Sequence, residues 1–111
     1  MLNRGGEKLS PRILEQHIRR QCPVTDVAVL PVETTPGMND VAVFAEVGKA
    51  PAPTLQDVRH ACAPHVSGLF LPSLIFPLPR LPRTATGKID HAALLRLAAD
   101  STRPDRRAES Y

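Results

Sequence analysis

The sequence predicts an α+β domain, with a small three-stranded, mainly antiparallel sheet, about three helices and a short N-terminal glycine hairpin. Three segments carry apolar residues at helical spacing, and each follows a good capping residue: Ser10, Thr54 and Asp90. Three other segments, residues 24–32, 41–47 and 69–78, are rich in apolar residues and are bounded by turn formers. With 111 residues, 42% of them hydrophobic, the chain can bury one modest core.

The helix boundaries follow from capping residues and prolines. The first helix is expected to begin at Pro11, a favoured first position. Thr54 and Asp57 form a carboxylate variant of the capping box for the second helix. The third helix follows Asp90 and extends to about Ala99. The expected apolar faces are Ile13, Leu14 and Ile18 in the first helix, Leu55, Val58 and Cys62 in the second, and His91, Leu94, Leu95 and Ala98 in the third.

The strand pattern predicts an antiparallel pair followed by an edge strand. In residues 41–47 alternate residues form one apolar face, with Phe44 and Glu46 on the other. Pro72 and Pro77 bracket the last strand, which indicates an edge position. Residues 100–111 are polar and aperiodic and are predicted to be a disordered tail, so the domain is expected to span residues 1–99.

Composition argues against several classes of protein. The formal net charge of +3 is mild, whereas nucleic-acid-binding proteins usually show a denser basic stripe, so no nucleic-acid partner is expected. No run approaches the ~18 apolar residues that span a membrane, and no signal peptide is visible. Cys22, Cys62 and the four histidines show no metal-ligand spacing, so no metal site is expected. Reduced, buried thiols suit a cytoplasmic location.

Residues 81–90, Leu-Pro-Arg-Thr-Ala-Thr-Gly-Lys-Ile-Asp, are the candidate functional stretch. Gly87 permits a positive φ, and Thr84 and Thr86 are short hydroxyl side chains before it. Lys88 is thereby held on a short loop between an apolar strand and a helix, as a compact cation suited to a phosphate or carboxylate oxygen. The alternative is an ordinary lysine on a solvent-exposed turn, which the local residues alone favour.

Two segments resemble motifs of the adenylate-forming superfamily, which comprises acyl- and aryl-CoA synthetases, adenylation domains of nonribosomal peptide synthetases, and luciferases. Residues 81–89 resemble its C-terminal lysine motif. Residues 3–11, Asn-Arg-Gly-Gly-Glu-Lys-Leu-Ser-Pro, resemble the segment after its interdomain hinge. The two segments occur in the family's order and at about its spacing. The resemblance covers roughly residues 1–99, is confined to the small C-terminal subdomain, and is nearest to the aryl-acid AMP ligases in residues 3–9.

The resemblance implies a two-step ligase reaction. Lys88 would act in the adenylation of a carboxylic acid by ATP, and Thr84, Thr86 and Gly87 would support the loop that meets the phosphate of ATP or AMP. The second step transfers the acyl group to coenzyme A or to the phosphopantetheine of an acyl, aryl or peptidyl carrier protein. The residues expected beside that pantetheine channel are Gly5, Gly6, Glu7 and Lys8.

The resemblance also implies a missing partner, because the large N-terminal domain of the family has no counterpart here. That core would supply the nucleotide site, the acyl pocket and Mg²⁺. The chain is then a fragment, a subdomain that completes a core in trans, or a remnant that only binds a partner. The contrasting function is a non-catalytic module that docks a carrier protein or a ligase core. Phe70 replaces the family's usual lysine, which would leave an apolar spot able to pack on a partner.

Overall fold

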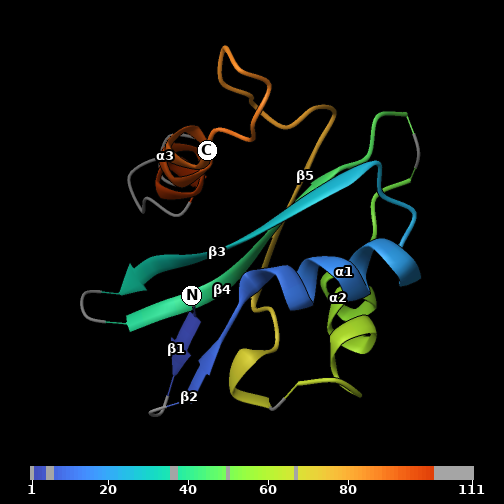
Figure 1. The fold of residues 1–111 in the computed structure, drawn as a ribbon, viewed down its shortest axis with the longest axis vertical. Helices are drawn as coiled ribbons and strands as arrows, with labels where there is room; N and C mark the ends of the chain where they lie inside the picture. Colours follow the sequence, from blue (N-terminus) through green and yellow to red (C-terminus); the bar gives the residue numbers. More distant parts are fainter. Residues whose placement is uncertain (1, 5–6, 36–37, 50, 67, 102–111) are drawn as a thin grey trace, which may run out of the picture.

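Three helices and two small sheets make up the described part of this computed structural model, residues 2–4, 7–35, 38–49, 51–66 and 68–101 (Figure 1). The elements, in chain order, are β1 (Leu2–Arg4), β2 (Glu7–Leu9), α1 (Pro11–Gln21), β3 (Asp26–Thr35), β4 (Met38–Glu46), α2 (Leu55–Cys62), the 3₁₀ turn η1 (Gly68–Phe70), β5 (Leu74–Leu78) and α3 (His91–Ser101). The predicted α+β class, with three helices and a three-stranded sheet, is confirmed. None of the described helices is long and apolar enough to cross a membrane.

The main sheet has the strand order β3-β4-β5 and is mixed. Strand β4 pairs with β3 in antiparallel fashion, with Val43 opposite Val29. It pairs with β5 in parallel, with Val43 opposite Ile75. The parallel pairing arises because α2 and η1 carry the chain back to the end of the sheet where β4 began. Strand β5 lies at an edge, as predicted, but Pro77 falls within the strand and does not follow it, which an edge strand tolerates.

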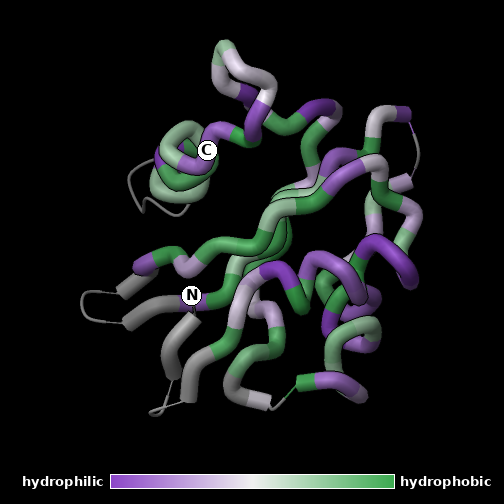
Figure 2. Tube along the Cα trace, viewed as in Figure 1, coloured by the Kyte–Doolittle hydropathy of each residue, from purple (hydrophilic) through white to green (hydrophobic). Residues whose placement is uncertain are grey.

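Helices cover both faces of this sheet (Figure 1), and hydrophobic residues follow the strands between them (Figure 2). Helices α1 and α2 pack on one face and α3 packs on the other. Strand β4 therefore has no solvated face, and Phe44 on its second face is fully buried and stacks on Phe76 at 5.0 Å between ring centroids. Continuous apolar runs in strands are typical of such two-sided burial.

In α1 and α3, fewer residues of the predicted apolar face are buried than the sequence pattern indicated. In α1, Leu14 and Ile18 are fully buried, but Ile13 is 38% exposed. In α3, Leu94 is fully buried, but Leu95 is 43% exposed. His91, which was assigned to the same face, is also exposed. In α1 and α3 the buried residues lie four positions apart along one row, so apolar neighbours beside that row stay in solvent.

The cap predictions hold for two of the three helices. Thr54 and Asp57 form the reciprocal capping box of α2, with bonds of 3.1 and 3.0 Å. At α3, Asp90 Oδ1 accepts the N–H of Ala93 at 3.1 Å. Ser10 occupies the N-cap position of α1, but its side chain makes no capping hydrogen bond.

The prediction that Phe70 leaves an apolar spot for a partner is wrong. Its side chain is only 3% exposed and packs in the cluster of α1 and α2, which includes Leu14, Ile18 and Val58. The turn η1 directs the ring inward, so this position supports the core and offers no surface to a partner.

The N-terminal strands form the predicted hairpin. Strand β1 pairs with β2 in antiparallel fashion, with Arg4 opposite Glu7, so only Gly5 and Gly6 separate the two strands. Those two glycines lie outside the described residues. The tail prediction also stays a prediction, because helix α3 is described to Ser101 and residues 102–111 are not described.

Candidate functional site: the lysine loop

Lys88 lies on a small, hydrogen-bonded turn between β5 and α3. The N–H of Thr84 donates to the carbonyl of Lys88 at 2.7 Å, and the N–H of Gly87 donates to the carbonyl of Thr84 at 2.9 Å. The hydroxyls of Thr84 and Thr86 lie 3.0 Å apart across the turn. Gly87 has a φ of +88°, in the region that favours glycine. The four loop residues predicted from the sequence therefore meet in one turn.

The base of the turn is closed and leads directly into α3. Arg83 and Ile89 form an isolated antiparallel bridge. The N–H of Asp90 donates to the carbonyl of Pro82 at 2.8 Å, while the carboxylate of Asp90 caps the helix. The loop is thus a short hairpin attached to the first turn of a helix.

Arg83 attaches this hairpin to the main sheet. Its Nη2 lies 3.0 Å from Oδ2 of Asp26 and 3.7 Å from Oε1 of Glu46. Its Nη1 donates to the carbonyl of Gly87 at 3.4 Å. Glu46 Oε1 also accepts the N–H of Leu81 at 2.9 Å, where the chain enters the loop. Two carboxylates at the end of the β3–β4 pair therefore hold the lysine loop.

Asp26 joins three elements at this point. Its Oδ1 accepts hydrogen bonds from Arg19 of α1 at 3.0 Å and from the N–H of Val27 at 2.8 Å. Partial burial raises the pKa of Asp26, but the hydrogen bonds from Arg83, Val27 and Arg19 outweigh it, so the pKa lies below its usual value. Asp26 is therefore held in its charged form.

The side chain of Lys88 is exposed to solvent. Among the residues that the structure describes, it has no hydrogen-bond or ion-pair partner, in contrast to Arg83. Lys88 borders an open depression of about 780 Å³ that also reaches Arg12 and Glu15 of α1 and the outer edge of β3. The turn thus presents a free cation at the rim of an accessible cleft.

Of the second predicted group of site residues, the structure describes Glu7 and Lys8, whereas Gly5 and Gly6 lie outside the described residues. Glu7 and Lys8 lie in β2, opposite Arg4 and Asn3 of β1. Figure 1 shows this hairpin and the loop that carries Lys88 at opposite ends of the view. The depression that Lys88 borders nevertheless also reaches Ser10 and Pro11, directly after β2.

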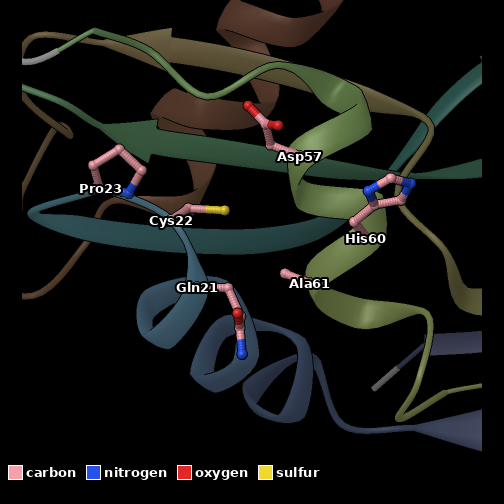
Figure 3. A pocket seen from close by; sticks show the side chains of 6 residues that line it. All are labelled: Gln21, Cys22, Pro23, Asp57, His60 and Ala61. Atoms are coloured by element: carbon pink, nitrogen blue, oxygen red, sulfur yellow. The ribbon is translucent and has the colours of Figure 1, made fainter.

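A second depression, of about 390 Å³, lies between α1 and α2 (Figure 3). It is lined in part by Cys22, Asp57 and His60, residue types that occur in nucleophilic sites. Each is otherwise engaged: Asp57 caps α2 through Thr54, and the ring of His60 bonds to Gln56 at 3.1 Å. Burial, and then the charge of Asp57, raise the pKa of the Cys22 thiol, which disfavours the reactive thiolate. This depression does not support nucleophilic catalysis.

Both cysteines are free and buried, as predicted. Within the described ranges, no group of three or more histidine, cysteine, aspartate or glutamate residues could hold a metal ion.

Sequence reasoning missed the residues that hold the loop: Arg19, Asp26 and Glu46. The available signal was weak: Asp26 is the first residue of β3 and Glu46 is the last residue of β4. Only the register, which places Asp26 opposite Glu46, shows that both meet Arg83.

Comparison with known proteins identifies relatives along nearly the whole chain. No protein-family model matches the chain. Triostin synthetase I of Streptomyces triostinicus is 32% identical over 105 residues, which cover 93% of this chain and 20% of the relative. Oxalate–CoA ligase of Saccharomyces cerevisiae is 29% identical over 106 residues, which cover 93% of this chain and 19% of the relative. The chain thus spans about a fifth of the length of these two relatives.

Solved structures share the fold. ATP-bound MatB of Rhodopseudomonas palustris superposes with a TM-score of 0.77 at 20% identity, over 89% of this chain and 20% of that protein. The anthranilate CoA ligase AuaEII, in complex with anthranoyl-AMP, superposes with a TM-score of 0.74 at 25% identity, over 90% of this chain and 20% of that protein. Each match again corresponds to about a fifth of a larger protein.

Proposed function

This chain belongs to the adenylate-forming enzyme superfamily as a C-terminal subdomain, and from this premise we propose that it carries the catalytic lysine of an ATP-dependent carboxylic-acid ligase. In the first step of the proposed reaction, a carboxylate attacks the α-phosphate of ATP, and pyrophosphate leaves. In the second step, a thiol displaces AMP and forms a thioester. Lys88 is assigned to the first step.

The observation that carries this proposal is the contrast between Arg83 and Lys88 in one turn. Arg83 is bound to the sheet. The ammonium of Lys88, in contrast, has no partner among the described residues and makes no contact that would stabilise the fold. A free cation on a tethered turn is suited to an anionic group supplied from outside the chain.

The chemistry needs such a cation because both reactants are anionic. Negative charge builds on the phosphorus and on the leaving pyrophosphate as the carboxylate approaches. A lysine ammonium placed between the reacting groups offsets their repulsion and helps to hold them in line. Thr84, Thr86 and Gly87 are proposed to shape the turn that delivers Lys88.

The hairpin β1–β2 is proposed to serve the second step. Gly5, Gly6, Glu7 and Lys8 would border the path of a pantetheine arm, which belongs either to coenzyme A or to a carrier protein. We expect the subdomain to turn between the two steps, so that first Lys88 and then this hairpin faces the reacting centre.

The proposed ligase also needs an N-terminal core, in the same chain or as a partner. The full-length relatives are about five times longer than the matching segment. We assign the nucleotide site, the acyl pocket and Mg²⁺ to that core, as the resemblance to the family implies. The names of two matched proteins give chemically different acids, oxalate and anthranilate, so the aryl-acid preference indicated by residues 3–9 stays a prediction.

The test combines the purified chain with a related ligase core truncated at the hinge, and measures acid-dependent exchange between ATP and pyrophosphate. Exchange is expected only with both pieces, and Lys88→Ala should lower it by ~10²-fold or more because a charge-stabilising group is lost. Lys49→Ala is the matched control, since Lys49 is also exposed near a glycine turn.

Two results would contradict this proposal. If Lys88→Ala and Lys49→Ala behave alike, Lys88 has no electrostatic role. If the chain binds the core but does not restore exchange, the non-catalytic docking function is favoured.

A further inference from the structure

We propose that Arg83 is a positioning residue, whose guanidinium locks the lysine turn onto the paired ends of β3 and β4 and thereby sets the reach of Lys88. This inference rests on the proposed function of Lys88 and adds a residue that acts through it.

The first support is the pair of carboxylates to which Arg83 binds. Asp26 and Glu46 are directly opposite each other in the β3–β4 register. Like charges at opposed positions in a sheet destabilise it unless a cation lies between them. Nη2 of Arg83 meets both, at 3.0 and 3.7 Å, so the sheet itself favours an arginine at this place.

The second support is the other side of the same guanidinium. Nη1 of Arg83 donates to the carbonyl of Gly87, the residue immediately before Lys88. One planar group therefore contacts both the rigid sheet and the tip of the turn. A lysine at this position has a single ammonium on a flexible chain and cannot keep both contacts in this geometry.

The third support is the way in which Asp26 is itself held. Its Oδ1 accepts hydrogen bonds from Arg19 of α1 and from the N–H of Val27, so the carboxylate is held by contacts other than those with Arg83. Helix α1, strand β3 and the lysine turn are thereby joined through one side chain.

The alternative is an exposed ion pair of little consequence, since surface pairs are often worth little. The backbone bonds Thr84–Lys88, Gly87–Thr84 and Asp90–Pro82 do maintain the turn. They lie within the hairpin, however, and fix its shape without fixing its direction relative to the sheet. The bonds of Arg83 supply that direction at the turn, beyond the hydrogen bond from the Leu81 N–H to Glu46 at its entry.

The first experiment does not depend on enzymatic activity. Amide hydrogen exchange is measured by NMR in the full 111-residue chain. The Leu81 amide, which donates to Glu46 on the sheet, reports the attachment of the turn. Arg83→Gln should lower its protection by ~10-fold while the Leu94 amide in α3 is unchanged, because only that attachment is released. Arg80→Gln, an exposed arginine just before the loop, should change neither of them.

The second experiment measures ATP–pyrophosphate exchange with the ligase core. Arg83→Gln should lower kcat by ~10-fold with little change in the KM for ATP, since a misplaced Lys88 weakens the transition state more than ground-state binding. Arg83→Lys should restore only part of this loss. In a Lys88→Ala background, Arg83→Gln should have less than ~2-fold effect, because two residues that act as one unit are not additive.

The outcomes separate the two proposals. If Arg83→Gln costs as much in the Lys88→Ala background as in the parent, Arg83 acts independently and the inference is overturned. If Lys88→Ala itself has no effect, the proposed function fails, while reduced protection of the Leu81 amide in Arg83→Gln would still establish the clamp. Should Arg83→Gln lower the protection of Leu94 as well, Asp26→Asn is used, which leaves Arg83 in place and should loosen the turn in the same direction.

Discussion

At the scale of single residues, the lysine loop depends on the backbone of Gly87. Its φ is +88°, and a Cβ added there would meet no atom within 4 Å. The glycine is therefore required for its conformation and not for space. Because this requirement is local, the sequence alone indicated it.

We predict that Gly87→Ala destabilises the chain by ~1–2 kcal/mol, because an L residue pays a penalty at positive φ. Gly68 is the matched control: it has equally open surroundings and no positive φ. The free energies of unfolding would be obtained from urea titrations. Equal effects of Gly87→Ala and Gly68→Ala would show that the turn adopts another conformation at no cost.

At the scale of elements, the outer edge of β3 is occupied by side chains. The N–H of Val29 donates to Oε2 of Glu15 on α1 at 3.0 Å, and the N–H of Val27 donates to the carboxylate of Asp26. Pro31 has no N–H to offer. Edge strands with free backbone donors invite pairing with other chains, so these residues protect β3 from it.

A second contact between elements joins α1 to the segment after α2. The rings of His17 and His65 stack with centroids 3.7 Å apart and an interplanar angle of 3°. Burial, and then the charges of His65 and Arg20, lower the pKa of His17 from its ordinary value. No local pattern in the sequence indicates that these two rings meet, because 48 positions separate them.

This stack predicts a pH dependence of stability. Because the folded-state pKa of His17 lies below the ordinary 6.5, the folded state favours the neutral ring. The contribution of the neutral His17 ring to the free energy of unfolding is fully present above pH 6.5. It is lost as the pH falls from there through the lower pKa that His17 has in the folded state. The free energy of unfolding, measured from about pH 7.5 to 5, should therefore fall less steeply in His17→Gln than in the parent.

His60→Gln is the control, since His60 bonds to Gln56 and is not part of the stack. A parent profile that matches that of His17→Gln would refute the assignment.

At the scale of the whole molecule, stability comes from two apolar layers, one on each face of the sheet. Leu94 and Ala98 of α3 pack against Phe44 and Leu30, while Leu14 and Ile18 of α1 belong to the opposite layer. Helix α3, which follows directly on the lysine turn, is thus anchored by the second layer.

The neighbouring residues Leu94 and Leu95 give a direct test of this arrangement. Leu94 is fully buried and Leu95 is 43% exposed, although both have the same side chain in the same helix. Leu94→Ala should destabilise the chain by ~2–5 kcal/mol, as buried leucines do on truncation. Leu95→Ala should cost less than ~1 kcal/mol. Thermal and urea unfolding would measure both, and similar losses would mean that α3 does not pack as described.

The sequence by itself determined the features that depend on neighbours along the chain. The capping box of Thr54 and Asp57, the cap at Asp90, the glycine turn before Lys88 and the order of the elements all arise within a few residues. Hydrogen bonds of this kind form between groups that the chain already holds close together, so residue type and spacing suffice to predict them.

Only the tertiary structure decided the features that join distant segments. These are the parallel pairing of β5, the burial of Phe70, the exposure of Leu95, and the clamp in which Arg83 meets Asp26 from 57 positions away. Each depends on how segments that are distant in the sequence pack against one another, including the register of the strands. Since a shift of one residue in register would turn Asp26 and Glu46 to other partners, no local pattern could specify this contact.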